Sequence, residues 1–216
     1  MNQDRYQAGG AEAAFEPGSR RRVLRNRLGI RRVREMQQAE SDALLAVQEW
    51  AVSHFDAQHR FTVEDIRGLH RQWLGDIYDW AGEYRNTNIS KGGFMFAAAV
   101  QVPRLMAAFE KAELSQYTPC EGMDETRLVR AMACTHAELV LIHPFREGNG
   151  RCARLLVWLM ALQAGLPPLD FSPLAGRGRK MYFAAIQTAL DGNYQPMEAC
   201  FSRVIRRTLR VYQGSS

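Results

Sequence analysis

The stretch that most constrains this chain runs from His143 to Arg154, with the sequence HPFREGNGRCAR. It follows residues 127–142, which contain no Gly or Pro and repeat apolar positions every three or four residues, so a mostly buried helix is predicted there. Pro144 disfavours a helical conformation at His143 and ends that helix. Because residues 151–162 again favour a helix, the segment between them is predicted to be a turn that joins two helices.

The residue types in this turn are those of an anion-binding site. Gly148 and Gly150 are able to adopt positive backbone dihedrals, which orient successive N–H groups toward one point. The helix that begins at Arg151 would present its N-terminus to the same anion, and its dipole adds to the attraction. Arg151 and Arg154 stand three residues apart on one helix face, where both guanidiniums are suited to bind outer phosphates.

Two further side chains in the turn add chemistry to the anion site. Glu147 offers hard oxygen ligands for Mg²⁺, the ion that usually accompanies nucleotide phosphates. His143 carries an imidazole, the side chain best suited to take a proton from an incoming hydroxyl near neutral pH. A base, a metal ligand and a phosphate-binding turn together predict nucleotidyl or phosphoryl transfer.

The run HPFREGNGRCAR is similar to the signature of Fic-domain proteins, His-Pro-Phe-x-(Asp/Glu)-Gly-Asn-Gly-Arg-x-x-Arg, at every fixed position. Other blocks resemble the family in the same order, namely Val23–Ile30, Trp80–Arg85, Asn88–Phe94 and the segment around Tyr182, so the resemblance covers roughly residues 20–210. It implies a protein adenylyltransferase, which transfers AMP from ATP, with Mg²⁺, to a Ser, Thr or Tyr hydroxyl of a target protein.

The same resemblance implies a role for each matching residue. His143 is the expected catalytic base and Glu147 the expected Mg²⁺ ligand. The residues expected to bind the nucleotide are Glu147, Gly148, Asn149, Gly150, Arg151, Arg154, Tyr182 and Lys91. Tyr182 and Phe183 are candidates to line the adenine, although helical periodicity alone places both in the core.

Residues 80–96 break the helical pattern. β-Favouring residues on both sides of Lys91-Gly92-Gly93 predict a short β-hairpin with a glycine turn. A hairpin of this length is only marginally stable alone, so it is expected to lie against the helices. In the Fic family the matching hairpin is a flap over the active site, and its edge holds the target by main-chain hydrogen bonds. The residues that the resemblance assigns to target docking are Lys91, Gly92, Gly93 and Phe94. A plain connector and, for Lys91, a solvated tip are the alternatives.

The other segments favour helices, so the expected fold is all-α, a Fic-fold helical bundle with the hairpin flap. The predicted helices are 34–53, 63–79 after an N-cap at Thr62, 100–114, 124–142, 151–164, 180–190 and 195–212. Residues 1–19 are rich in small and polar side chains and predict a flexible N-terminal segment, which leaves 20–216 as one Fic domain.

Charge and composition narrow the function classes. The chain has 28 Lys and Arg against 23 Asp and Glu, a net charge of +5, and eight arginines lie within residues 20–34. A solvated helix face is the plainer interpretation of that stretch, and a contact for an acidic partner or nucleic acid is the alternative. No aromatic interleaving or DNA-reading motif accompanies it, so direct nucleic-acid binding is not expected.

The expected location is the cytoplasm. No run approaches the roughly 20 apolar residues of a membrane helix, and residues 1–19 lack the apolar core of a secretory signal. The four cysteines show no metal or redox spacing and are expected to be reduced, buried thiols. His136 lies seven residues before His143 on the same helix face, but no third metal ligand has suitable spacing, so a packed or hydrogen-bonded His136 is expected.

An absent motif predicts how the activity is controlled. Many Fic proteins are inhibited by a helix that carries Ser/Thr-x-x-x-Glu-(Gly/Asn), whose Glu pairs with the second motif arginine, which is Arg154 in this chain. Glu precedes Gly only at Glu121 and Glu147, without Ser or Thr four residues earlier, and it never precedes Asn. The resemblance therefore implies a bacterial toxin whose inhibitory helix comes from a separate small antitoxin. Relatives with the Val23–Ile30 block modify type II topoisomerases such as DNA gyrase and topoisomerase IV.

Two other functions stay open as alternatives. One is a Fic-fold transferase that moves another group, such as phosphate or UMP, but the phosphate-transferring branch departs from the motif at Gly148 and Arg151. The other is a non-enzymatic basic binding module, which leaves the run HPFREGNGR without a reason.

Overall fold

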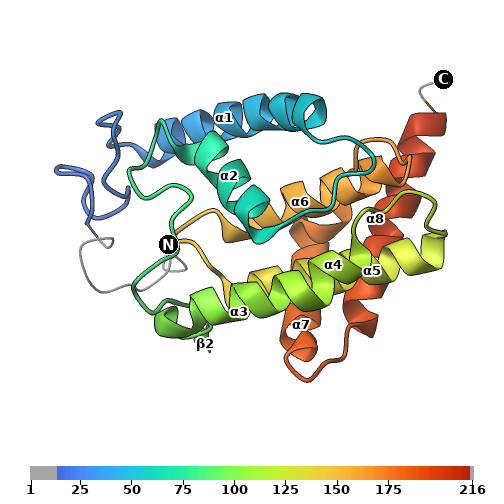
Figure 1. The fold of residues 1–216 in the computed structure, drawn as a ribbon. Helices are drawn as coiled ribbons and strands as arrows, with labels where there is room; N and C mark the ends of the chain where they lie inside the picture. Colours follow the sequence, from blue (N-terminus) through green and yellow to red (C-terminus); the bar gives the residue numbers. More distant parts are fainter. Residues whose placement is uncertain (1–13, 215–216) are drawn as a thin grey trace. The chain divides into compact units, whose positions relative to one another are not determined.

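A computed structural model describes residues 14–214 of the chain. The elements follow in the order α1 (Val33–His54), α2 (Val63–Leu74), β1 (Ser90–Lys91), β2 (Phe94–Met95), α3 (Val102–Phe109), α4 (Ser115–Tyr117), α5 (Glu125–Ile142), α6 (Asn149–Gln163), α7 (Arg179–Ala189) and α8 (Gln195–Gln213) (Figure 1). Short helical turns cover Ala99–Gln101, Glu110–Leu114, Ser172–Leu174 and Gly176–Gly178. The prediction of an all-α fold with one small hairpin is confirmed.

The described residues divide into two compact units. The first contains residues 14–54, 63–107 and 142–152, and the second contains 55–62, 108–141 and 153–214. The first unit therefore carries α1, α2, the hairpin and residues 143–150, which are called the motif turn below. Of the segment predicted to be flexible, residues 1–13 lie outside the described part, while Phe15 forms an isolated antiparallel bridge with Leu24.

In the first unit, α1 and α2 pack side by side (Figure 1). The acidic residues Glu64 and Asp65 occupy the first turn of α2, where they complement the helix dipole. The predicted extension of this helix to Asp79 is wrong, because the helix ends at Leu74. The next residue is Gly75, where a Cβ atom would lie only 2.6 Å from the Arg71 carbonyl oxygen. Glycine has no Cβ atom and therefore fits at this helix end.

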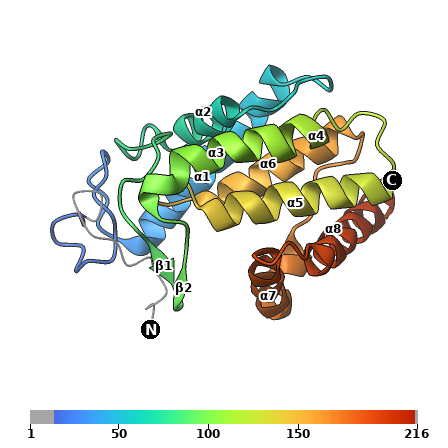
Figure 2. The ribbon, with the colours of Figure 1, turned by 60° about the horizontal axis from the view of Figure 1, so that its bottom comes forward.

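The hairpin has the predicted form (Figure 2). Ser90 pairs with Met95 and Lys91 with Phe94 in an antiparallel ladder. Gly92 and Gly93 have φ values of 56° and 80°, so both central residues of the two-residue loop require the left-handed region that glycine adopts without strain.

All secondary-structure elements in the described part of the second unit are helical. α7 and α8 pack against each other (Figure 1). One face of α8 is buried through Met197, Phe201 and Val204. All four cysteines of the chain are free and buried, as predicted. Among residues 14–214, no helix has both the length and the apolar character that a membrane crossing requires.

The basic stretch differs in part from its prediction. All eight arginines between residues 20 and 34 are exposed, as a solvated surface requires. They do not form a helix face, because α1 begins only at Val33 and the preceding chain is irregular. That irregular chain is fixed by Asn26, whose side-chain amide donates to the carbonyls of Leu24 and Ile30 at 3.0 and 2.9 Å.

Candidate active site

The motif turn begins with an unusual backbone conformation at His143. α5 ends at Ile142, and His143 has a φ of 54°, which is uncommon for a residue with a side chain. The following Pro144 disfavours the right-handed helical conformation at this position, in agreement with the predicted helix end. Because such strain persists only where the surroundings enforce it, the contacts around His143 identify what holds the turn.

Arg85 holds the start of the turn. Its side chain is buried, its Nε–H donates to the His143 carbonyl at 2.7 Å, and its main-chain N–H donates to the Pro144 carbonyl at 2.9 Å. The same guanidinium donates to the carbonyls of Thr87 and Ala97, which lie before and after the hairpin. One side chain thus fastens both ends of the hairpin segment to the backbone of the predicted base.

The imidazole of His143 lies against the hairpin segment. It is buried, and it stacks on Phe96 with ring centroids 3.6 Å apart and an interplanar angle of 22°. Phe96 follows directly after β2. Lys91 and Phe94 are half-buried on the paired strands, whereas Gly92 and Gly93 are exposed at the tip. The hairpin therefore lies beside the predicted base, and its role in target docking stays a prediction.

Asn149 closes the turn upon itself. Its side-chain oxygen accepts from the Phe145 N–H and its amide donates to the Phe145 carbonyl, both at 2.8 Å. The Asn149 side chain is thus engaged within the turn, and only its main chain remains for a phosphate. With this brace α6 starts at Asn149, so the prediction of a positive φ at Gly150 is wrong: Gly150 belongs to the first turn of α6.

Gly148 is the glycine that the turn requires. Its φ is 81°, and a Cβ atom there would lie 2.7 Å from Cζ3 of Trp73 on α2. Both the backbone conformation and the close approach of Trp73 exclude a side chain. The carbonyl of Gly148 accepts from the N–H groups of Arg151 and Cys152, which starts α6 with its N-terminus at the turn.

His70 fastens the middle of the turn to α2. Its Nδ1 accepts from the Gly82 N–H at 2.9 Å, so its Nε2 carries the proton and donates to the Glu147 carbonyl at 3.0 Å. Burial lowers the pKa of His70 to about 4, with a smaller contribution from the positive charge of Arg151, and the ring is neutral at pH 7. It also stacks on Phe145 at 3.8 Å. The prediction of a structural His70 agrees with these contacts.

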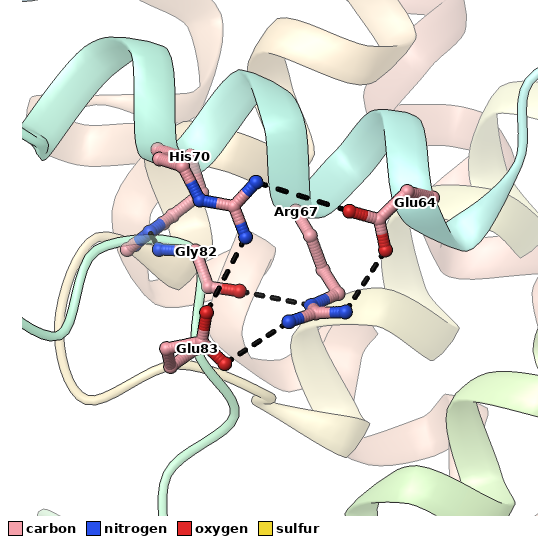
Figure 3. A network of polar contacts seen from close by, with 6 residues as sticks. Glu64, Arg67, His70, Gly82 and Glu83 are labelled. Atoms are coloured by element: carbon pink, nitrogen blue, oxygen red, sulfur yellow. Dashed lines mark hydrogen bonds and ion pairs between the residues drawn. The ribbon is translucent and has the colours of Figure 1, made fainter.

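Arg67 on α2 holds the loop whose Gly82 N–H donates to His70. Arg67 donates to the Gly82 carbonyl at 2.9 Å and pairs with Glu64 and Glu83 at 2.9 and 3.0 Å (Figure 3). Gly82 has a φ of 79°. In this conformation the Gly82 N–H points toward the His70 imidazole, which explains why a glycine follows Trp80 and Ala81.

Arg151 lies between two acids rather than in open solvent. Its Nη1 contacts Oε2 of Glu40 at 2.8 Å, its Nη2 lies 3.7 Å from Oε1 of Glu147, and the guanidinium sits over the Trp73 ring at 4.6 Å. Glu40 comes from α1 and was not singled out from the sequence. The sequence does contain a signal for Glu40, because this acid lies on the same helix face as the buried apolar residues Met36, Val47 and Ala51.

Two predicted site residues belong to the second unit. Tyr182 is buried and its hydroxyl lies 2.8 Å from Nε2 of His136, which is the hydrogen-bonded His136 that the sequence predicted. Burial raises the pKa of Tyr182, and the nearby positive charge of Arg154 opposes that shift. Burial likewise lowers the pKa of His136 to about 3. The roles of Tyr182 and Arg154 toward a nucleotide stay predictions.

The donor set around the motif turn is compatible with Mg²⁺ that is bound jointly by the protein and a nucleotide. Within residues 14–214, no group of three or more His, Cys, Asp or Glu side chains could hold an ion. Glu147 is a single, partly exposed carboxylate. Mg²⁺ commonly binds one or two carboxylates together with substrate phosphates and water, so Glu147 fits such a site only when a nucleotide supplies the remaining oxygens.

The likeness to known proteins agrees with this geometry. Residues 60–161 match the model of the Fic/DOC family. The protein adenylyltransferase VbhT of Bartonella schoenbuchensis is 29% identical over 197 residues, which is 89% of this chain and 40% of VbhT. The protein adenylyltransferase Fic of Culex quinquefasciatus is 32% identical over 152 residues, 70% of this chain and 29% of that protein. The chain thus spans less than half the length of these relatives.

Solved structures share the fold. The BepC protein of Bartonella tribocorum, crystallised with bound AMPPNP, has a TM-score of 0.68 at 23% identity and covers 85% of this chain and 92% of its own. The Fic domain of a Bartonella quintana effector with bound ADP has a TM-score of 0.64 at 21% identity, with coverages of 85% and 90%. At these identities the likeness concerns the fold.

Proposed function

We propose, from the premise that residues 60–161 form a Fic domain with protein adenylyltransferase homologues, that this chain transfers AMP from ATP to a hydroxyl side chain of another protein. We extend the domain to residues 20–216, as the sequence blocks outside the family match suggest. The observation that carries the proposal is the motif turn, in which a histidine with a positive φ, held by Arg85, stands at the start of the short turn that leads into the N-terminus of α6.

The proposed reaction assigns the chemical step to His143. Its imidazole takes the proton from a Ser, Thr or Tyr hydroxyl while the hydroxyl oxygen forms a bond to the α-phosphorus of ATP. The bond between that phosphorus and the oxygen bridging to the β-phosphate breaks, and pyrophosphate leaves. The hydrogen bond from Arg85 to the His143 carbonyl fixes the backbone from which the imidazole acts.

The phosphates are proposed to bind at the N-terminus of α6. The main-chain N–H groups of Gly148, Asn149 and Gly150 lie where the first helical turn has no acceptors of its own. Glu147 would hold Mg²⁺, which supplies positive charge to the phosphates when it is bound. Arg151 and Arg154 are proposed to contact the outer phosphates, Tyr182 the adenine, and Lys91 the nucleotide from the hairpin.

The target is proposed to dock on the hairpin through Lys91, Gly92, Gly93 and Phe94, with main-chain hydrogen bonds along a strand edge. Following the family resemblance, we propose a bacterial, cytoplasmic toxin that modifies a type II topoisomerase, DNA gyrase or topoisomerase IV. A separate small antitoxin would supply the inhibitory glutamate to Arg154. Inducible expression in a bacterial host tests this part: wild-type chain that leaves growth unchanged without an antitoxin would contradict it.

Labelled ATP tests the proposed reaction. The chain is incubated with Mg²⁺, a bacterial lysate and ATP labelled on either the α- or the γ-phosphate. Transfer of the α-label to protein supports adenylyl transfer, transfer of the γ-label indicates phosphoryl transfer, and no label on protein favours a binding module. His143→Ala is expected to reduce transfer at least about 100-fold while ATP binding persists. His54→Ala, at an exposed histidine in the same unit, is the matched control and should keep full activity.

A further inference from the structure

We propose that Glu40 is a positioning residue that holds Arg151 away from Glu147 and thereby leaves the Glu147 carboxylate available to Mg²⁺. The inference deepens the proposed function and rests on it, because the metal would enter with the nucleotide. It concerns an acid on α1, about a hundred residues before the motif, to which neither the sequence nor the family resemblance assigned a role.

Glu40 is a buried carboxylate whose two oxygens are both engaged. Only 5% of its side chain is exposed, Oε2 accepts from Nη1 of Arg151 at 2.8 Å, and Oε1 accepts from the Tyr78 hydroxyl at 2.7 Å. The pKa of Tyr78 is raised by burial and by the charge of Glu40, so the phenol remains a hydrogen-bond donor. A buried charge requires such partners, and Arg151 is the partner with the opposite charge.

The two acids around Arg151 are held at different distances. The contact to Glu40 is a charge-assisted hydrogen bond at 2.8 Å, whereas the 3.7 Å separation from Glu147 is too long for one. Trp73 lies beneath the guanidinium and limits its tilt. The chain thus directs the strong contact of Arg151 to the acid on α1 and not to the acid of the motif.

Without Glu40, Glu147 would be the remaining acid near Arg151 among residues 14–214. Glu147 lies four residues earlier in the chain, and its carboxylate already sits near Nη2. A close pair with the guanidinium would occupy its oxygens and neutralise the charge that attracts a cation. Removal of Glu40 should therefore weaken metal binding specifically. Residues that orient metal ligands from outside typically change metal affinity about 10–100-fold when they are replaced.

The experiment measures ADP binding by calorimetry, once across a Mg²⁺ titration and once in EDTA. In Glu40→Gln, the Mg²⁺ concentration needed for half of the metal-dependent gain in ADP affinity should rise about tenfold. ADP affinity in EDTA should fall clearly less than ADP affinity with Mg²⁺, because the phosphate-binding main chain at the N-terminus of α6 is unaltered and Arg151 is only one of the proposed phosphate contacts. Glu49→Gln, at an exposed glutamate on the same helix, is the matched control and should leave both measurements unchanged.

A double variant isolates the proposed route through Arg151. In an Arg151→Gln background, Glu40→Gln should shift the Mg²⁺ requirement by less than about threefold, because no guanidinium remains to be diverted. If Glu40→Gln fails to fold, Glu40→Asp replaces it; its shorter side chain weakens the contact with Arg151 and should give an intermediate shift of about threefold.

Three outcomes would overturn the inference. The Mg²⁺ requirement could remain within twofold of wild type in a folded Glu40 variant, the affinity in EDTA could fall as much as the affinity with metal, or the shift could persist without Arg151. A wild-type chain that binds no ADP at any Mg²⁺ concentration would instead overturn the proposed function together with this inference, so the two failures are distinguishable.

Discussion

The motif turn and the hairpin lie side by side in the first unit but are held in different ways. The turn is fastened by four side chains from four segments: Arg85, Asn149, His70 and, through Arg151, Glu40. The hairpin has two residue pairs and a tip of two exposed glycines, and Arg85 fastens only its ends. This difference agrees with the proposed roles, because a catalytic group needs a fixed position and a strand edge that docks a target needs accessible main chain.

The largest effect on stability is expected when a glycine of the motif turn is replaced by alanine, and the same replacement in the hairpin provides the comparison. Gly148→Ala combines a positive φ with a 2.7 Å approach to Trp73, so the free energy of unfolding should fall by about 3 kcal/mol and ATP binding should be lost. Gly93→Ala has nearly the same φ, 80°, with open space around it, and should cost about 1 kcal/mol. Chemical denaturation measures both, and equal costs would contradict the contrast between the regions.

Asn149→Ala tests the brace within the turn. It removes two buried hydrogen bonds to the Phe145 main chain and leaves that N–H and carbonyl unsatisfied, which should cost about 2 kcal/mol. Asn149→Asp keeps the acceptor and loses the donor, so an intermediate loss is expected. Asn88→Ala, at a residue before the hairpin that accepts from the exposed Ala99 N–H, should cost less than about 1 kcal/mol. Thermal unfolding ranks the three variants.

Acid should weaken the turn through His70. The pKa of His70 is about 4 in the folded protein and about 6.5 in the unfolded chain, so the unfolded chain binds more protons between these values. The free energy of unfolding should therefore decrease as pH falls from 6.5 toward 4. Buried His136 acts in the same direction, so the test compares wild type with His70→Gln, whose slope should be smaller by up to about 1.4 kcal/mol per pH unit. Identical slopes would contradict the assignment.

A smaller effect on stability than at Gly148 or Asn149 is expected at the contact between the two regions. Phe96→Ala removes the ring stacked on His143 but little else of the turn, so unfolding should change by about 1 kcal/mol. The imidazole would then be less well oriented, and kcat for AMP transfer should fall more than KM for ATP rises. A proportional rise in KM without a loss of kcat would show that Phe96 serves the nucleotide instead of the base.

The sequence predicted what depends on local residue preferences. The end of α5 before Pro144, the glycine turn of the hairpin and most helix bounds agree with the structure within a few residues, because each follows from periodicity or from backbone restrictions. The exception is α2, which ends at Leu74 and not at Asp79. The resemblance supplied the roles of the motif residues, which remain proposals. The predicted positive φ at Gly150 was wrong because the Asn149 side chain starts α6 earlier than composition suggests.

The contacts that hold the turn could not be derived from local preferences. Arg85, His70 and Glu40 contact the turn from 58, 77 and 111 residues away in the chain, and such pairings depend on how the helices pack. Of these three residues, only Glu40 could be recognised in the sequence, as a charged residue on an otherwise apolar helix face. A buried acid at a core position indicates that a cation must meet it, but the sequence does not identify which of the 28 Lys and Arg residues does so.

Arg85 secures the start of the turn and His70 its middle, with groups that respond differently to protons. A guanidinium stays charged across the whole range in which proteins remain folded, whereas an imidazole surrenders its acceptor nitrogen once it is protonated. Acidification toward pH 4 should therefore remove the contact of His70 with the Gly82 N–H, whereas its Nε2–H keeps donating to the Glu147 carbonyl and Arg85 keeps donating to the His143 carbonyl. The contact that acid removes first is thus the one between α2 and the Gly82 loop, and it is removed only near pH 4.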